Sequence, residues 1–221
     1  MAKLSYDYKS FLAKYRTTEG ETTEKEYVTI SQAEEIFLQR SAKKCGNKFA
    51  KFYITAKIHK TPWATRPVVS TCGTLMAGLS KWTDYWLQQL TPNIPTYLRD
   101  SSQLLEQLKK LGPLSPGARL FTADAVSMYT NIETSHGLRI INEWMTNYQD
   151  ELPDDFPSAA MKNALRMVLT NNIFEFGDSF LNNSAAVRWV HQWHVYMQLF
   201  TMHTTNGQSS CYKNTTIILS R

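Results

Sequence analysis

The sequence predicts an α+β domain in which helices pack on one face of an antiparallel sheet. Apolar residues recur at helical spacing in several segments, and short runs of β-branched and aromatic residues lie between turn residues. The chain has 221 residues, 43% of them hydrophobic, and this length is enough for one ordinary core or two small lobes. The predicted order is helices, a strand pair, two helices, a strand, two helices and a hairpin, an order that suits this class.

The N-terminal part of the chain is polar and then becomes helical. Residues 1–28 are rich in charged and hydroxyl side chains, with TTEGETTEKE as a loop, and we treat them as a separate polar segment. Ser31 and Glu34 then form an S-x-x-E pattern, in which each side chain satisfies a free backbone N–H of the first helical turn. This pattern predicts a helix over residues 32–44.

A strand pair and a long helix are predicted next. Residues 49–58 and 66–71 have strand composition, and Pro62 marks a turn between them because it fixes φ and removes a backbone donor. The following stretch has helical apolar spacing, which predicts a helix with one buried face rather than a cofactor site. Its apolar residues are Met76, Leu79, Trp82, Tyr85, Trp86 and Leu90.

The remaining elements follow from caps, turns and apolar runs. Ser101 or Ser102 is expected to cap a helix that carries four leucines, and residues 118–123 read as a buried strand because they are almost continuously apolar. Helices are predicted at 134–148 and 157–170. The segment NIFEFGDSF then predicts a β-hairpin with Gly177 and Asp178 at its turn.

Composition favours a folded protein with an anionic partner. The net charge is +5, and the chain holds 6 Trp, 11 Tyr and 10 Phe. Three widely spaced cysteines, Cys45, Cys72 and Cys211, form neither a disulfide framework nor a zinc pattern, so a reducing compartment is expected. No apolar run approaches the ~18 residues that a membrane span requires, and we expect no membrane association.

A basic segment runs from Lys51 to Ser70 and reads KFYITAKIHKTPWATRPVVS. It carries Lys57, Lys60 and Arg66 on the predicted strand pair. Arg66 is suited to a triphosphate, because its planar fork binds phosphate at two points, and the lysines add point charges. The alternative is that these cations mark a solvated strand edge, where lysine discourages aggregation.

A lone carboxylate, Asp124, ends the apolar run LFTA. Nucleotidyl transfer uses two divalent ions that hold the attacking and leaving oxygens, and magnesium prefers carboxylate and carbonyl oxygens. Asp124 and the carbonyl of Ala125 would provide such oxygens, and Tyr129 follows five residues after Asp124. The alternative is that Asp124 is a helix cap or a turn residue.

The two segments together resemble the reverse transcriptases of Penelope-like retroelements. That family carries a string similar to F-Y-x-x-x-K-I-H-K-x-x-x-x-x-R-P-I-V-S in its fingers, and this chain has FYITAKIHKTPWATRPVVS. The family has a palm string similar to D-V-x-S-L-Y-T-N-I, and this chain has DAVSMYTNI from Asp124 to Ile132. The likeness covers about residues 29–181, in the same order.

The resemblance implies a right-hand fingers and partial-palm fold at residues 29–181 and an RNA-directed DNA polymerase activity. It implies that Asp124 with Ala125 binds Mg2+, that Tyr129 excludes a 2′-hydroxyl, and that Arg66 with Lys57 or Lys60 holds the nucleotide. The expected partners are an RNA template, a DNA primer and deoxynucleoside triphosphates, and the expected location is intracellular and nuclear.

The resemblance stops after the hairpin. The family continues with a string similar to Q-x-x-G-x-A-M-G-T and then a paired-aspartate turn that completes the two-metal site, and residues 182–221 contain neither. One alternative-frame translation of the codons possible from Asn182 onward reads QLSGSAMGTSVACIYATIYYAYHER, which contains the missing string. We therefore interpret residues 182–221 as an out-of-frame or disordered tail, and predict that this chain is inactive alone.

The tail and the composition of the chain allow three further interpretations. His191, His194 and His203 with Cys211 could suggest zinc, but their spacing matches no standard site. A catalytically dead, basic RNA-binding remnant is compatible with the charge and the aromatic residues. A non-functional remnant predicts low solubility and no specific partner.

Overall fold

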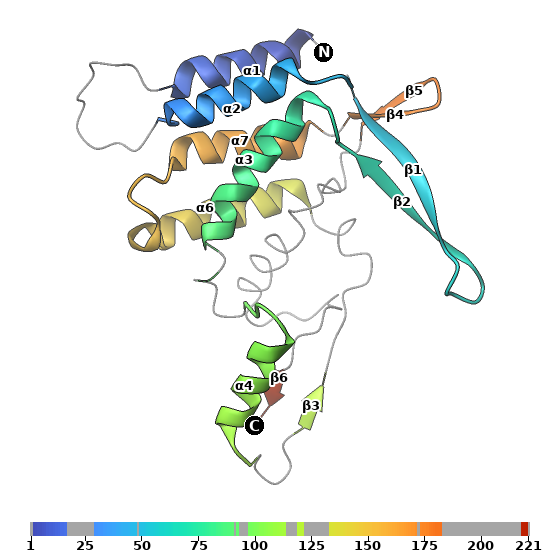
Figure 1. Cartoon of the computed structure of the whole chain (residues 1–221), viewed down its shortest axis with the longest axis vertical. Helices are drawn as coiled ribbons and strands as arrows, with labels where there is room; N and C mark the ends of the chain where they lie inside the picture. Colours follow the sequence, from blue (N-terminus) through green and yellow to red (C-terminus); the bar gives the residue numbers. More distant parts are fainter. Residues whose placement is uncertain are drawn as a thin grey trace.

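The computed structural model describes residues 2–16, 29–47, 49–90, 92, 97–113, 119–121, 133–171, 173–182 and 218–220. Within these residues the fold is mixed, with six α-helices and a four-stranded sheet (Figure 1). The elements are α1 (Ala2–Tyr15), α2 (Gln32–Lys43), β1 (Ala50–Lys57), β2 (Ala64–Ser70), α3 (Leu75–Leu90), α4 (Ser101–Leu111), β3 (Arg119–Phe121), α6 (Thr134–Asn147), the short 3-10 helix η2 (Gln149–Glu151), α7 (Ser158–Thr170), β4 (Ile173–Phe176), β5 (Ser179–Asn182) and β6 (Ile218–Ser220).

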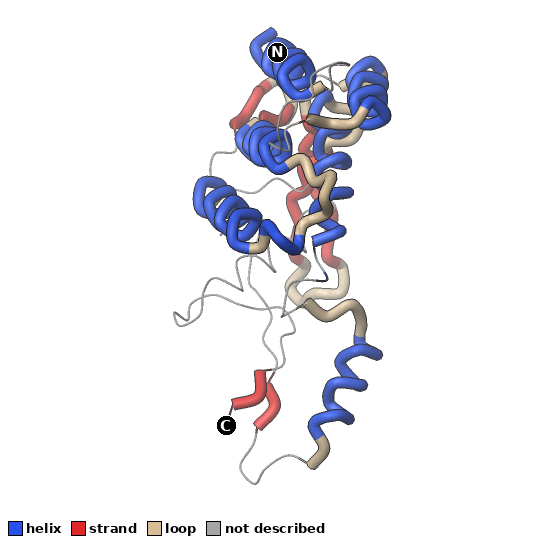
Figure 2. Tube along the Cα trace, turned by 90° about the vertical axis from the view of Figure 1, so that its left-hand side faces the viewer, coloured by secondary structure: helices blue, strands red, loops and turns tan. Residues whose placement is uncertain are grey.

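The core lies between helices. Figure 2 shows α1, α7 and α6 in one layer, with α2 and α3 packed against it. The buried hydrophobic cluster comes almost entirely from these five helices, whereas β1 and β2 add only Ala50 and Val69 to the buried hydrophobic residues. The expected packing of helices on one face of the sheet is therefore wrong in this respect: the helices bury their apolar faces against one another.

The sheet has the order β2-β1-β4-β5. The pairs β1–β2 and β4–β5 are antiparallel, as each is joined by a short turn. However, β1 and β4 are parallel, with Ala50 opposite Phe174 and Lys51 opposite Glu175. The sheet is thus mixed rather than antiparallel. Among the described elements, the helices α3, α4, α6 and α7 lie between β1 and β4 in the chain, and such a long connection permits parallel pairing.

The sequence pattern predicts no element within residues 1–28, yet α1 belongs to the core. Tyr8, Phe11 and Tyr15 recur at spacings of three and four and are almost fully buried. The Tyr8 hydroxyl donates a hydrogen bond of 3.1 Å to the carbonyl of Leu38 in α2, and burial raises the pKa of Tyr8. The polar composition of this segment comes from the exposed face of the helix and conceals its apolar stripe.

The predicted helix with the capping box is confirmed as α2. The Ser31 hydroxyl caps it by accepting from the backbone N–H of Glu34, and the Glu34 carboxylate accepts a hydrogen bond of 2.8 Å from the backbone N–H of Ser31. The predicted apolar helix is confirmed as α3, with Trp82 and Trp86 almost fully buried. Gly78 of α3 lies against α2, where an added Cβ would overlap the Cβ of Ser41.

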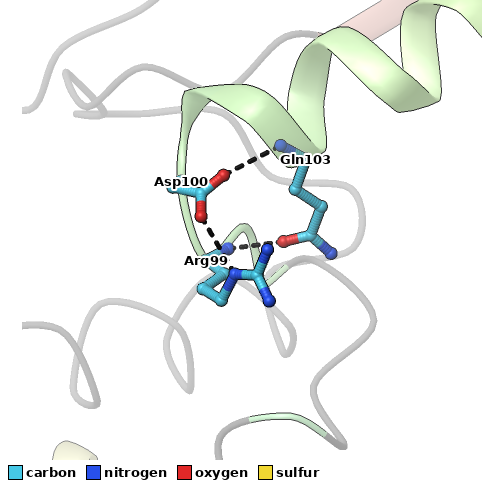
Figure 3. A network of polar contacts seen from close by, with 3 residues as sticks. All are labelled: Arg99, Asp100 and Gln103. Atoms are coloured by element: carbon cyan, nitrogen blue, oxygen red, sulfur yellow. Dashed lines mark hydrogen bonds and ion pairs between the residues drawn. The ribbon is translucent and has the colours of Figure 1, made fainter.

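The helix predicted after residue 100 is confirmed as α4, but its cap differs (Figure 3). Asp100, not Ser101 or Ser102, accepts a 2.9 Å hydrogen bond from the backbone of Gln103, and Arg99 Nε donates to the other carboxylate oxygen at 2.9 Å. The bond from Gln103 and that from Arg99 lower the pKa of Asp100. An aspartate outcompetes a serine here because its second oxygen also accepts from Arg99. No residue of α4 is buried, so its leucines stay accessible.

The later predictions agree with the described residues. The two helices expected at 134–148 and 157–170 are α6 and α7, and the hairpin is β4–β5 with Gly177 at a φ of +57°, a conformation that glycine adopts without strain. The strand expected at 118–123 is β3, which pairs with β6 and not with the main sheet. Residues 218–220 of the predicted tail thus form a strand, and its residues 183–217 and 221 lie outside the described part.

Candidate nucleotide-binding ribbon

The two longest strands form a ribbon that projects from the helices (Figure 1). β1 pairs with β2 from Lys51 to Lys57, but with β4 only at Ala50 and Lys51. Beyond these two residues the ribbon is two-stranded, and both of its faces and its tip are largely exposed. We call the pair β1–β2 with its connecting turn, residues 50–70, the ribbon.

The register brings two of the predicted triphosphate contacts to one face. Lys57 lies opposite Ala64, and Arg66 lies opposite Thr55. Residues directly opposite, and residues two apart on one strand, share a face of a sheet. Lys57 and Arg66 are therefore diagonal neighbours, about 7–8 Å apart by the usual geometry of such pairs. Each has a small residue opposite it, which leaves space above the ribbon for its long side chain.

Two further residues share this face, and sequence reasoning missed both of them as candidate contacts. Lys51 and Tyr53 lie on the same side as Lys57 because they precede it by even numbers of residues. The signal was available, since K-x-Y-x-T-x-K alternates with apolar residues in the sequence. This basic face of the ribbon thus comprises Lys51, Tyr53, Thr55, Lys57, Ala64, Arg66, Val68 and Ser70.

The cations of the basic face are accessible. Arg66 is exposed and Lys57 is half-buried, and no ion pair to either is found among the described residues. The Thr55 hydroxyl donates to the Arg66 carbonyl at 3.4 Å, which ties the two strands beside the guanidinium. Cations without a carboxylate partner retain their full charge for an external anion.

Lys60, the third predicted contact, lies in the turn at the tip. Its backbone N–H donates to the Lys57 carbonyl at 3.2 Å, and it is exposed. The tip also carries His59, the cis Thr61–Pro62 bond, and Trp63, whose side chain is 79% exposed. Lys60 is therefore not placed by the strand register, and Arg66 with Lys57 is the better-defined pair.

Aromatic rings anchor the base of the ribbon. Phe52 stacks on Phe174 with ring centres 5.7 Å apart and meets Phe176 edge-on at 5.0 Å. These residues lie on the face opposite the basic one, because Phe52 alternates with Lys51 and Tyr53. These contacts hold the ribbon in place where β1 meets β4, because aromatic pairs of this geometry stabilise a fold beyond the effect of the apolar area that they bury.

The predicted metal ligands Asp124 and Ala125, and Tyr129, lie outside the described residues. The described strand β3 ends at Phe121, three residues before Asp124. Among the described residues no group of three or more His, Cys, Asp or Glu side chains could hold a metal ion. Magnesium binding by Asp124 and Ala125 therefore stays a prediction.

Comparison of the chain with protein-family models, curated protein sequences and solved structures finds no match. In the part of the chain that the structure describes, no helix has the length and apolar character needed to cross a bilayer. The two described cysteines, Cys45 and Cys72, are exposed thiols.

Proposed function

We propose that the chain is the fingers and partial palm of an RNA-directed DNA polymerase of Penelope-like type, and that the basic face of the ribbon holds the triphosphate of the incoming nucleotide. The observation that carries the proposal is the placement of Lys57 and Arg66 on one accessible face. A nucleoside triphosphate is a polyanion, and two fixed cations that are diagonal neighbours can contact adjacent phosphate groups.

In the proposed reaction the residues of this chain have separate roles. Arg66 and Lys57 would bind and orient the phosphates, Asp124 with the Ala125 carbonyl would hold Mg2+, and Tyr129 would restrict the sugar to deoxyribose. The metal would stabilise the charge that develops on the transferred phosphate. A single carboxylate cannot hold two ions, so we expect no primer extension by the 221-residue chain with an RNA template, a DNA primer and deoxynucleoside triphosphates. Magnesium-dependent extension that is lost in Asp124→Ala would contradict this.

Nucleotide binding tests the ribbon directly. We would titrate the chain with a fluorescent deoxynucleoside triphosphate, with and without Mg2+, and compare Arg66→Gln and Lys57→Gln with Lys43→Gln. Lys43 is an exposed cation at the end of α2, so its variant matches the change in charge. A hydrogen bond to a charged group contributes about 1.5–3 kcal/mol, so Arg66→Gln is expected to weaken binding at least tenfold. Equal affinities of the Arg66 and Lys43 variants would refute the assignment of the ribbon.

A second candidate is an RNA-binding remnant without catalysis. The exposed rings of Tyr53 on the basic face and Trp63 at the tip favour it, because bases stack on accessible aromatic side chains. It predicts salt-sensitive RNA binding that Asp124→Ala does not change. Binding to structured RNA that is no stronger than binding to heparin would exclude this alternative.

A further inference from the structure

A groove of about 550 Å3 runs between α1 and α7. Each wall is a polar stripe of one helix. Lys3, Ser10 and Lys14 line it from α1, at positions separated by seven and four residues, and Asn163 and Arg166 line it from α7. The floor is apolar and includes Phe11, which is buried in the core. The two helices that form the walls are held in place because their other faces are packed in the hydrophobic core.

The groove is positively charged. Lys3, Lys14 and Arg166 line it, and Asp7 is the one acidic residue among the described lining residues. No ion pair that joins Asp7 to these cations is found in the described part of the chain. Lys14 instead lies over the ring of Tyr15, with its Nζ 5.1 Å from the ring centre. The net charge of +2 therefore favours an anionic occupant.

The charge continues over α7 into a second groove. A groove of about 560 Å3 lies between α6 and α7, and Arg166 lines both grooves. The second groove also holds Lys162 and Arg139, and Arg139 is paired with Glu143 at 2.7 Å. A cation that bridges two adjacent grooves suits an extended chain of negative charges better than a small anion.

An aromatic ring identifies the kind of polyanion. Tyr6 lines the α1–α7 groove and is 70% exposed, although it is a large aromatic residue on a helix whose other rings are buried. An accessible ring beside lysine and arginine is the arrangement on which bases stack while their phosphates are neutralised. An acidic peptide would need the cations but would gain little from the ring.

We propose that the α1–α7 groove binds single-stranded nucleic acid, with Lys3, Lys14 and Arg166 on its phosphates and Tyr6 stacked on a base. Arg166 then guides the strand toward the α6–α7 groove. This surface does not depend on the ribbon or on catalysis, because it is built from other elements. It would operate in a polymerase and in a protein without polymerase activity alike.

The test is the salt dependence of RNA binding by the full chain. We would measure the fluorescence anisotropy of a labelled, unstructured 20-nucleotide RNA between 50 and 250 mM KCl. The groove variant is Lys3→Gln/Lys14→Gln/Arg166→Gln. The control variant, Lys44→Gln/Lys109→Gln/Lys110→Gln, removes the same charge from exposed positions outside the groove. Circular dichroism would establish that both variants are folded, which we expect because all substituted residues are exposed.

Each phosphate contact on a single strand adds about 0.7 to the slope of log affinity against log salt. The groove variant is therefore expected to lower the magnitude of this slope by about 2 and the affinity at least tenfold, and the control variant to change the affinity less than twofold. Tyr6→Leu is expected to weaken binding about fivefold or more, because it removes a stacking contact. The same losses are expected in an Arg66→Gln background, which separates this groove from the ribbon.

Two results would overturn the proposal. One is an equal loss of slope and affinity in the groove and control variants, which would show that only the overall charge matters. The other is full affinity in Tyr6→Leu together with displacement of the RNA by polyglutamate at the same charge concentration. That result would assign the groove to an acidic polypeptide instead.

Discussion

Replacing Glu34 with alanine should cost more stability than any other single change at the surface of α2. Its Oε1 accepts hydrogen bonds from the indole nitrogens of Trp82 at 2.7 Å and Trp86 at 2.8 Å. Its Oε2 accepts from the backbone nitrogen of Ser31 at 2.8 Å and from the Ser31 hydroxyl at 2.6 Å. One carboxylate therefore closes the capping box of α2 and joins α2 to the buried face of α3.

The expected loss follows from what the substitution leaves unpaired. Trp82 and Trp86 are 3% and 4% exposed, so each indole N–H would lose its acceptor inside the protein, at about 1–3 kcal/mol each. Loss of the capping box adds about 1 kcal/mol. Glu34→Ala should thus lower the free energy of unfolding by about 3–7 kcal/mol, a large share of the 5–15 kcal/mol of a typical domain. Glu34→Gln keeps one acceptor oxygen and should lose about 1–2 kcal/mol.

The assay is urea denaturation followed by circular dichroism and by tryptophan fluorescence. The matched control is Glu35→Ala, because Glu35 lies in the same turn and, within the described residues, its side chain accepts a hydrogen bond only from the side chain of Gln39. It should lose about 0.5 kcal/mol or less. In a double-mutant cycle with Trp86→Phe, the loss from Glu34→Ala should become smaller. A Glu34→Ala variant within 1 kcal/mol of the control would refute the assigned role of this carboxylate.

Three other changes test the packing of the helices. Gly78→Ala should lower the free energy of unfolding by about 1–2 kcal/mol despite the higher helix propensity of alanine, because the new Cβ would overlap that of Ser41. In urea denaturation, the double variant Gly78→Ala/Ser41→Gly should recover most of this loss. Burial raises the pKa of Asp84 above its ordinary value of 3.8, although the hydrogen bond from Gln88 acts in the opposite direction. The folded protein therefore favours the protonated carboxyl group. The contribution of Asp84 to stability is present below pH 3.8 and is lost as the pH rises through the pKa of the folded state. Asp84→Asn should therefore raise the melting temperature at pH 7 and have less effect at pH 3, and an equal effect at both values would contradict this. Tyr8→Phe should cost about 1 kcal/mol in urea denaturation, because it removes the buried hydrogen bond from the Tyr8 hydroxyl to the Leu38 carbonyl of α2, and an unchanged unfolding midpoint would contradict this.

Local signals in the sequence predicted most of the described elements. The S-x-x-E pattern at Ser31 located the start of α2, the apolar spacing from Met76 located α3, and Gly177 located the β4–β5 turn. These predictions hold because each depends on residues within about one helical turn or one tight turn of each other. The cap of α4 was displaced to Asp100, since two adjacent side chains compete for the same backbone donors.

The sequence by itself determined where the described helices after α1 and the ribbon lie and which cations the ribbon carries. Only the tertiary structure decided that β1 and β4 are parallel and that α1 belongs to the core. It also decided that Glu34 accepts hydrogen bonds from Trp82 and Trp86, which lie 48 and 52 residues further along the chain. The α1–α7 groove also forms only in the tertiary structure, because the two helices that line it are more than 140 residues apart in the chain. Such contacts depend on which apolar faces bury one another, and that choice is made by the whole chain rather than by any local pattern.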